Sequence, residues 1–328
     1  MSAPNGASAS GGAEERIEQP WLNRTNNYVD IAEIGRGAYG TVWTCRNVLT
    51  GQLLARKRIR VQMNENEGVP QNVIREISTL RSLDRFGHEN IVRLHAIEHG
   101  LTQDHRELWI DLLCEYCDFD LYTYLQRLAE PLTEPQTRQI AHSMVRGTDF
   151  LHQHNIIHRD LKPQNVLINR DGSTKLADFG LARLYSLYAV YTPTAVTLWY
   201  RSPEVLLQCQ YGPSVDLWSL GCIIGELYTR LALFRGQTEV QQLHLIFQTI
   251  GSPSAQQWPS DAVVTRDSFP LYPRVPLQRL LPRAPNDAID LIQRLLAFNP
   301  CERPSAKEAL RHAYFQMLLV GPPLVAAN

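Results

Sequence analysis

The sequence predicts an α+β protein in which a small β-rich lobe is followed by a large α-rich lobe. Two observations carry this prediction: apolar and polar residues alternate in short runs over the first 90 residues, and apolar residues recur at helical spacing from about Leu121 onward. The chain has 328 residues, enough to bury a substantial core, and it shows no repeat at solenoid periods. Because ligands favour the junction between two such lobes, we expect the functional site there.

The first lobe begins with three runs that have the pattern of strands. Residues 28–34 alternate, residues 41–45 follow a glycine cluster, and residues 52–59 follow the turn residues 47–51. These runs predict a three-strand meander.

A helix is predicted next, after Pro70, because Val73, Ile77 and Leu80 recur at helical spacing and proline suits a first helical turn. Glu76 lies three residues after Val73 and four before Leu80, so it projects from the apolar face of this helix. An acid in that position needs a cation as partner.

The second lobe contains clear local signals. Residues 133–136 have the pattern of a capping box that opens a helix running through Leu151. The short apolar runs 166–168 and 175–177 flank Asp171-Gly172, which predicts a hairpin. The remainder alternates helical stretches with proline-rich connections.

Composition excludes several classes of function. With 44% hydrophobic residues the chain is not disordered as a whole, and 32 Lys and Arg against 33 Asp and Glu create no field that attracts nucleic acid or an anionic membrane. The most apolar stretch, 215–228, contains Asp216 and Glu226 and predicts a buried helix, not a membrane span. Residues 2–12 are small and polar, so we expect no secretory signal and a disordered tail over 1–27.

Six cysteines are too few for a disulfide framework in a chain of this length, which favours a reducing compartment. Cys114 and Cys117 form a single C-x-x-C without a second pair or a nearby histidine. Core packing is therefore favoured over a metal or redox site.

A glycine-rich segment follows the first predicted strand. Residues 35–42 have the pattern G-x-G-x-x-G-x-V, which alone is compatible with an ordinary glycine hairpin. A Rossmann site would need a helix after the last glycine, whereas Thr41–Trp43 continues as strand. The pattern favours a flap whose backbone amides cover phosphates.

Polar residues with suitable chemistry follow in order along the chain. Lys57 on the third strand and Glu76 on the next helix can form a phosphate clamp held by a carboxylate. Asn165 and Asp178 offer the oxygen ligands that Mg²⁺ prefers. Asp160, within His158-Arg-Asp, is then free to orient a hydroxyl group and accept its proton.

These motifs resemble those of eukaryotic protein kinases from about Tyr28 to Phe315. Ser202-Pro-Glu204 matches the A-P-E motif of that family except that serine replaces alanine, while Asp216 and Arg303 match the buried aspartate and the arginine that pairs with Glu204. The resemblance implies a bilobal kinase domain over 28–315, divided into an N-lobe (28–113), a hinge (114–120) and a C-lobe (121–315), with a C-terminal tail over 316–328.

Further motifs resemble the cyclin-dependent kinases. Residues 67–76 resemble their cyclin-binding helix, and residues 196–201 resemble the end of their activation segment. Residues 37–40, 191–193 and 268–270 are most similar to the G1 kinases that partner cyclin D, of the cyclin-dependent kinase four/six type. The resemblance implies transfer of the γ-phosphate of ATP to Ser/Thr-Pro sites in G1 progression, retinoblastoma-like substrates, ankyrin-repeat and other inhibitors, and residence in nucleus and cytoplasm.

The same resemblance assigns roles to individual residues. Asp160, Lys162, Lys57 and Glu76 would be catalytic, and Asn165 and Asp178 would bind Mg²⁺. The residues expected to bind ATP are Ile34, Gly35, Arg36, Gly37, Ala38, Tyr39, Gly40, Thr41, Val42, Ala55, Lys57, Glu115, Cys117, Asp120 and Leu167.

Regulatory and substrate-binding roles follow in the same way. Thr192 matches the threonine that a separate activating kinase phosphorylates, and Tyr39 matches an inhibitory phosphotyrosine. The arginines expected to hold phosphorylated Thr192 are Arg75, Arg159 and Arg183. The residues expected to form the pocket for a proline after the acceptor are Ala195, Val196, Thr197 and Arg201.

Three positions depart from the family pattern. Cys114 replaces a phenylalanine before the hinge, which suggests a deeper pocket behind adenine, and Arg56 replaces an apolar strand residue, which we expect to snorkel outward. Gln71-Asn72 replaces small residues on the cyclin-facing helix. A kinase with another cyclin type and a pseudokinase scaffold stay open as alternatives, whereas a mitogen-activated kinase would need Thr-x-Tyr where Thr192-Pro-Thr stands.

Overall fold

The computed structural model describes residues 27–37, 40–62, 69–102, 107–184 and 197–316. These residues form two compact units: a sheet unit, with the described residues before Val69 and Ala96–Leu113, and a helical unit, with Val69–His95 and the described residues from Cys114 onward. One unit is β-rich and the other mainly helical, which confirms the predicted α+β class. Of the two expected tails, only Asn27 and Gln316 lie within the described residues.

The sheet unit is built on a five-stranded sheet with the strand order β1-β2-β3-β5-β4. The strands are β1 (Tyr28–Gly37), β2 (Gly40–Asn47), β3 (Leu53–Gln62), β4 (Leu94–Leu101) and β5 (Glu107–Glu115). β1, β2 and β3 pair antiparallel in sequence order, so the predicted meander is confirmed. A buried cluster of Cys45, Leu54 and Leu113 forms an apolar core on this sheet. At Gly40 a Cβ atom would stand 1.9 Å from the carbonyl oxygen of Arg58, so β2 requires glycine there to pair with β3.

Arg56 does not snorkel outward, and that expectation is wrong. Its side chain is 7% exposed and lies among carboxylates from three other strands, at 2.6 Å from Asp30, 3.5 Å from Asp111 and 3.9 Å from Glu98. Arg58 contacts both oxygens of Asp111, at 2.8 and 2.7 Å. These carboxylates balance the positive charge of Arg56 inside the fold, so its guanidinium does not need to reach water.

The helical unit begins with α1 (Gln71–Asp84), and Pro70 lies immediately before its first residue. The helix buries Val73, Glu76 and Leu80, as the spacing predicts, whereas Ile77 is only half-buried. Glu76 therefore projects from the buried face of α1.

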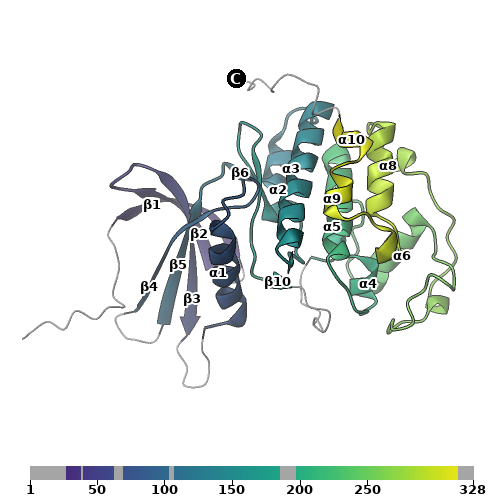
Figure 1. Cartoon of the computed structure of the whole chain (residues 1–328), viewed down its shortest axis with the longest axis horizontal. Coiled ribbons are helices and arrows are strands. Elements are labelled where there is room, and N and C mark those ends of the chain that lie inside the picture. Colours follow the sequence, from purple (N-terminus) through teal and green to yellow (C-terminus); the bar gives the residue numbers. More distant parts are fainter. Residues whose placement is uncertain (1–26, 38–39, 63–68, 103–106, 185–196, 317–328) are drawn as a thin grey trace, which may run out of the picture. The chain divides into compact units, whose positions relative to one another are not determined.

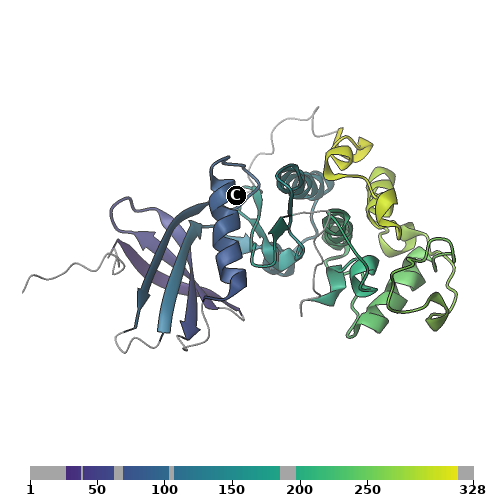
Figure 2. The ribbon, with the colours of Figure 1, turned by 60° about the horizontal axis from the view of Figure 1, so that its bottom comes forward.

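Two long helices, α3 (Glu134–Gln153) and α5 (Ser214–Thr229), lie side by side at the centre of the helical unit (Figures 1 and 2). The capping box at the start of α3 is present: the side chain of Gln136 accepts a hydrogen bond from the backbone N–H of Thr133 at 3.0 Å. Every residue from Val215 to Tyr228 is buried, so the predicted buried helix is confirmed.

Shorter elements complete the helical unit. The remaining α-helices are α2 (Leu121–Arg127), α4 (Pro203–Leu206), α6 (Glu239–Ile250), α7 (Leu277–Leu280), α8 (Asn286–Leu295), α9 (Ala306–Ala309) and α10 (Ala313–Gln316). The 3₁₀ turns are η1 (Pro163–Asn165), η2 (Leu198–Tyr200), η3 (Arg266–Ser268) and η4 (Pro300–Glu302). The short strands are β6 (Phe119–Asp120), β7 (Ile156–Ile157), β8 (Val166–Ile168), β9 (Thr174–Leu176) and β10 (Arg183–Leu184).

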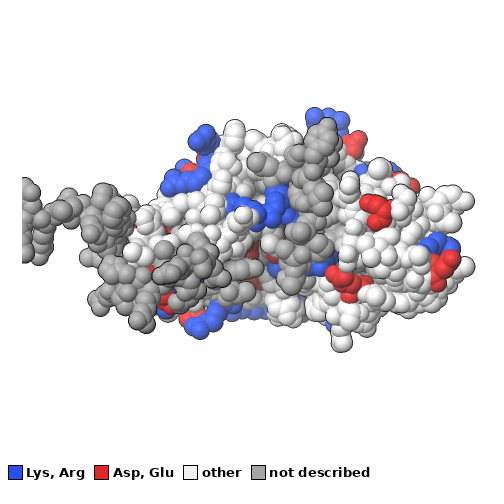
Figure 3. All heavy atoms as spheres, turned by 90° about the horizontal axis from the view of Figure 1, so that it is seen from below, with Lys and Arg blue, Asp and Glu red and all other residues white. Residues whose placement is uncertain are grey.

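β8 and β9 pair antiparallel, so the predicted hairpin is confirmed. No helix in the described part of the chain is long and apolar enough to span a membrane. On the face drawn in Figure 3, basic and acidic side chains are interspersed with uncharged residues.

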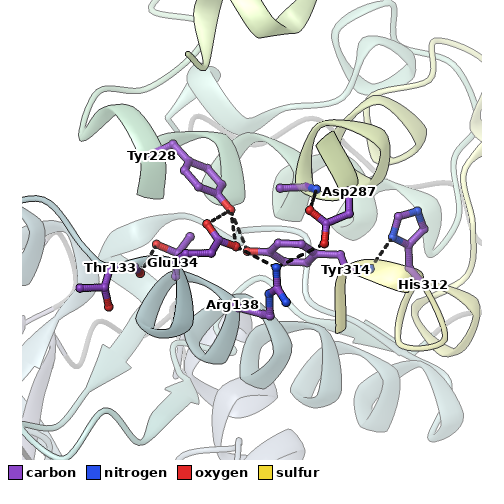
Figure 4. A network of polar contacts seen from close by, with 9 residues as sticks. Thr133, Glu134, Arg138, Tyr228, Asp287, His312 and Tyr314 are labelled. Atoms are coloured by element: carbon purple, nitrogen blue, oxygen red, sulfur yellow. Dashed lines mark hydrogen bonds and ion pairs between the residues drawn. The ribbon is translucent and has the colours of Figure 1, made fainter. Parts of the chain in front are cut away.

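A polar network joins four helices of this unit (Figure 4). The hydroxyl of Tyr228 on α5 donates to Glu134 on α3 at 2.9 Å and lies 2.9 Å from the hydroxyl of Tyr314 on α10. Arg138 contacts Glu134 and, on α8, Asp287, each at 3.2 Å, and its guanidinium stacks over the Tyr314 ring. The last described helix is thus tied to the two central helices.

Candidate active site

Asp216 anchors the loop that carries the expected catalytic residues. This fully buried carboxylate accepts hydrogen bonds from the backbone N–H groups of His158 and Arg159, both at 2.9 Å, and lies 2.9 Å from Nε2 of His152. Burial acts to raise the pKa of Asp216, but the contact with His152 and the backbone bonds outweigh it, so the pKa is lowered. The fixed carboxylate sets the backbone directly before Asp160.

Two residues of this loop, Lys162 and Asn165, converge on the carboxylate of Asp160. Lys162 Nζ lies 2.8 Å from Oδ2 of Asp160, and Nδ2 of Asn165 donates to the same oxygen at 2.9 Å and to the Asp160 carbonyl at 2.8 Å. Burial raises the pKa of Asp160, and the positive charge of Lys162 opposes this rise. A buried carboxylate with a raised pKa and a fixed orientation can accept a proton.

Asp178 follows on the segment after β9. Its φ angle of 63° lies in the left-handed region, which is uncommon for residues other than glycine but which aspartate tolerates better than most. The negative charge of Asp178 contributes to the raised pKa of Asp160. A Cβ atom added to Gly180 would lie 3.8 Å from Oε2 of Glu76, so the expected glutamate on α1 is near this segment.

The residues present fit a magnesium ion that takes its other ligands from phosphates and water. No group of three or more His, Cys, Asp or Glu side chains among the described residues is arranged to hold a metal. The amide nitrogen of Asn165 donates to Asp160, so its amide oxygen is the atom that can bind a metal ion together with Asp178. One amide and one carboxylate suit Mg²⁺, which seldom occupies a cage made by protein alone.

The glycine-rich segment forms a hairpin of the sheet unit, with Gly35 opposite Val42, Arg36 opposite Thr41 and Gly37 opposite Gly40. β2 continues directly from Gly40, so the Rossmann alternative is wrong. Ala38 and Tyr39 lie outside the described residues.

The other expected ATP-binding residues of the sheet unit lie on β1 and on β3, the strand that pairs with β2 of the glycine hairpin. Lys57 lies opposite Val42, and Ala55 lies opposite Thr44 on the same pair of strands. Ile34, on β1, is 51% exposed. The sequence-predicted clamp thus has Lys57 in the sheet unit and Glu76 in the helical unit.

The expected hinge has its own contacts. The backbone N–H of Glu115 donates to the Arg93 carbonyl at 2.8 Å, and the Glu115 carboxylate lies 3.1 Å from Lys175. All six cysteines are free, and burial raises the pKa of Cys117 to about 12, so this residue is a neutral thiol in the core. The C-x-x-C is therefore not a disulfide.

Two further expected ATP-binding residues, Asp120 and Leu167, are opposite each other in the pairing of β6 with β8. The carboxylate of Asp120 also caps α2, where Oδ1 accepts from the Thr123 N–H at 2.8 Å and Oδ2 from its hydroxyl at 2.6 Å. This capping role was not among the roles expected for Asp120.

The three arginines expected to hold a phosphate all lie in the helical unit. Arg75 donates to the side chain of Gln71 one turn earlier on α1. Arg159 has a left-handed φ of 71° and lies over the ring of Tyr211, and Arg183 is on β10. Thr192 lies outside the described residues.

Of the residues expected to hold the substrate, Ala195 and Val196 are outside the described residues. Thr197 is exposed and precedes η2 directly. Arg201 follows η2, and its Nη1 lies 3.4 Å from Oε1 of Glu239 on α6, a partner that the sequence analysis missed.

The predicted pair of Glu204 and Arg303 is confirmed. Two nearly parallel contacts of 2.6 and 2.7 Å join the buried carboxylate to the buried guanidinium. Such a bidentate pair is both strong and directional. It links the start of α4 to the residue that follows η4.

A β-rich unit with a glycine hairpin and a helical unit with this catalytic loop define a protein kinase. Comparison with known families agrees: residues 28–315 match the model of the protein kinase domain. The chain belongs to the protein kinase family.

Similar curated proteins narrow the class. The chain is 45% identical to the cyclin-dependent kinase 4 homolog of Caenorhabditis elegans over 86% of this chain and 70% of that protein. It is 44% identical to cyclin-dependent kinase 4 of Xenopus laevis (88% and 90% of the two chains) and 43% identical to that of Mus musculus (88% and 95%). The chain is therefore a cyclin-dependent serine/threonine kinase of the cyclin-dependent kinase 4 type.

Proposed function

We propose that this kinase uses Mg²⁺ and ATP to phosphorylate Ser/Thr-Pro sites with a D-type cyclin, and that it drives G1 progression in nucleus and cytoplasm. The observation that carries the chemical part is the convergence of Lys162 and Asn165 on Asp160, within 2.9 Å. The sequence motifs shared with the G1 kinases support the choice of cyclin and of retinoblastoma-like substrates.

In this proposal Asp160 orients the substrate hydroxyl and accepts its proton. Lys162 and Asn165 both contact Oδ2, so we expect the hydroxyl at Oδ1. The raised pKa of Asp160 makes it a better proton acceptor than an exposed aspartate. Lys162 is then close enough to stabilise negative charge on the transferred group.

The remaining groups bind and position. Asn165 and Asp178 would hold Mg²⁺, which supplies charge neutralisation at the phosphates when bound. The glycine hairpin, Lys57 and the hinge would bind ATP, with Glu76 as the carboxylate partner of Lys57. Residues 195–197 and Arg201 would select proline after the acceptor, because proline lacks the N–H that would be buried unpaired there.

Regulation is proposed at two modified residues. A phosphate on Thr192, added by a separate activating kinase, would be held by Arg75, Arg159 and Arg183 and order the segment around it. Phosphorylation of Tyr39 would oppose ATP binding. Ankyrin-repeat proteins are proposed as inhibitors on the basis of the same family motifs.

The test is phosphorylation of a Ser-Pro-x-Lys peptide by the chain alone and with a D-type cyclin, beside the variant Asp160→Asn. We expect activity only with the cyclin, and loss of that activity in the variant. Activity without any cyclin, or only with another cyclin type, would refute the D-type partnership. Silence under every condition with Thr192 phosphorylated would refute the enzymatic proposal and favour a scaffold.

A further inference from the structure

The segment from Thr197 to Arg201 is held by hydrogen bonds to the loop before α6 and to α5. The indole N–H of Trp199 donates to the carbonyl of Gly236, before α6, at 3.0 Å. The hydroxyl of Tyr200 donates to the buried carboxylate of Glu226 on α5 at 2.7 Å. Successive side chains thus fix the segment to the loop before α6 and to α5, and the next residue is Arg201.

Arg201 is a largely, but not fully, buried cation with a carboxylate partner. Its side chain is only 13% exposed, and burial lowers its pKa, while the charges of Glu239 and Asp160 act in the opposite direction. The carboxylate of Glu239 lies 3.4 Å from Nη1. Arg201 therefore contacts a carboxylate that comes from α6, and the charge of the expected catalytic carboxylate also acts on it.

The structure fixes the position of Glu239 independently of Arg201. It is the first residue of α6, directly after Thr238, whose hydroxyl caps the helix by accepting from the Gln241 N–H at 3.1 Å. An anion in the first turn is favoured by the helix dipole. Before the helix, the backbone at Gly236 passes close to Gln242, since a Cβ atom on Gly236 would lie 2.6 Å from the backbone nitrogen of Gln242.

We propose that Glu239 is a positioning residue for substrate selection: it holds in place Arg201, a residue proposed to select proline after the phosphorylated residue. The inference rests on the proposed role of Arg201. Glu239 acts through Arg201 and does not itself touch the reacting atoms. Its loss therefore weakens discrimination between substrates more than it weakens catalysis.

The test compares Glu239→Gln and Glu239→Lys with the unchanged chain, each as the cyclin complex, on Ser-Pro-x-Lys and Ser-Ala-x-Lys peptides. The ratio of the two kcat/KM values is the readout. We expect the ratio for Ser-Pro over Ser-Ala to fall about threefold in Glu239→Gln, which is the effect expected for loss of a partly exposed ion pair. The change should be a higher KM for the Ser-Pro peptide. Glu239→Lys should lower the ratio further, because it places a cation beside Arg201.

Gln241→Ala is the matched control. The side chain of Gln241 accepts from the Gln237 N–H at the same helix start, at 2.8 Å, so the control perturbs this turn without removing the charge beside Arg201. It should leave the ratio unchanged. Equal losses for both peptides in Glu239→Lys would show a merely structural role and overturn the inference.

The outcomes distinguish failure of the inference on Glu239 from failure of the proposed Ser/Thr-Pro specificity. If the unchanged complex prefers Ser-Pro and Glu239→Lys keeps that preference, only the inference on Glu239 fails. If the unchanged complex phosphorylates both peptides equally well, the proposed specificity fails, and the inference falls with it.

Discussion

Replacing Arg56 by leucine tests whether the buried ionic cluster of the sheet unit is required for stability. The substitution removes the cation that lies 3.9 Å from Glu98, whose side chain is 7% exposed, and 2.6 Å from Asp30, which is about one-third exposed. Asp111 keeps its bidentate contact with Arg58. Removing one partner of a buried pair typically costs about 3–5 kcal/mol, and the exposure of Asp30 places the expected loss near the lower value, about 3 kcal/mol.

The assay is urea unfolding of Arg56→Leu beside Arg60→Leu. Arg60 is on the same strand, but its side chain is 70% exposed and lies 4.0 Å from the carboxylate of Glu107, so the control should lose about 0.5 kcal/mol or less. The double variant Arg56→Leu with Glu98→Leu should recover most of the loss, because an apolar pair can replace a buried ionic one. If Arg56→Leu costs no more than Arg60→Leu, the reasoning is refuted.

Four more outcomes are expected. Asp160→Asn should lower kcat at least about 100-fold without changing the thermal midpoint, since general bases contribute on that scale; an active variant would exclude Asp160 as base. In a pH–rate profile, the acidic limb should have its midpoint above a pH of about 3.9, the pKa of an ordinary aspartate, because burial raises the pKa of Asp160 and its carboxylate is protonated at a higher pH. A midpoint at or below about 3.9 would contradict this expectation. Cys117, with a pKa of about 12, should resist iodoacetamide at pH 8 while exposed Cys301 reacts, as read by mass spectrometry. Glu204→Ala should destabilise the chain by about 3–5 kcal/mol, since it leaves buried Arg303 without its carboxylate; a cost under about 1 kcal/mol would refute that role.

Features encoded within a few residues could be predicted from the sequence. The capping box at Thr133, the hairpin of β8 and β9, the meander and the fully buried α5 all depend on local spacing, and all are confirmed. The contacts among Asp160, Lys162 and Asn165 span five residues, so one short motif brings these groups together.

Features that depend on distant pairing could not be predicted from residue patterns; the Glu204–Arg303 pair was expected only because the family resemblance implies it. The carboxylates around Arg56 come from β1, β4 and β5, and Asp111 is 55 positions further along the chain than Arg56. Single-sequence patterns do not give strand order, so an arginine on a strand was expected to reach water. Glu239 is 38 residues from Arg201 and is an ordinary first-turn acid in the sequence.

The division of the chain into two units bears on how a cyclin could act. Lys57 belongs to the sheet unit, whereas α1, with Glu76, belongs to the helical unit that also carries Asp160. Glu76 is buried on one face of α1, and Ile74, on the same helix, is 53% exposed. A partner that binds the exposed face of α1 therefore contacts the unit of the catalytic loop. The proposed Lys57–Glu76 clamp has one member in each unit. Such a partner can favour the arrangement with the clamp formed only by binding it more tightly than an arrangement without the clamp. Activation by a cyclin would then be a shift between these two populations.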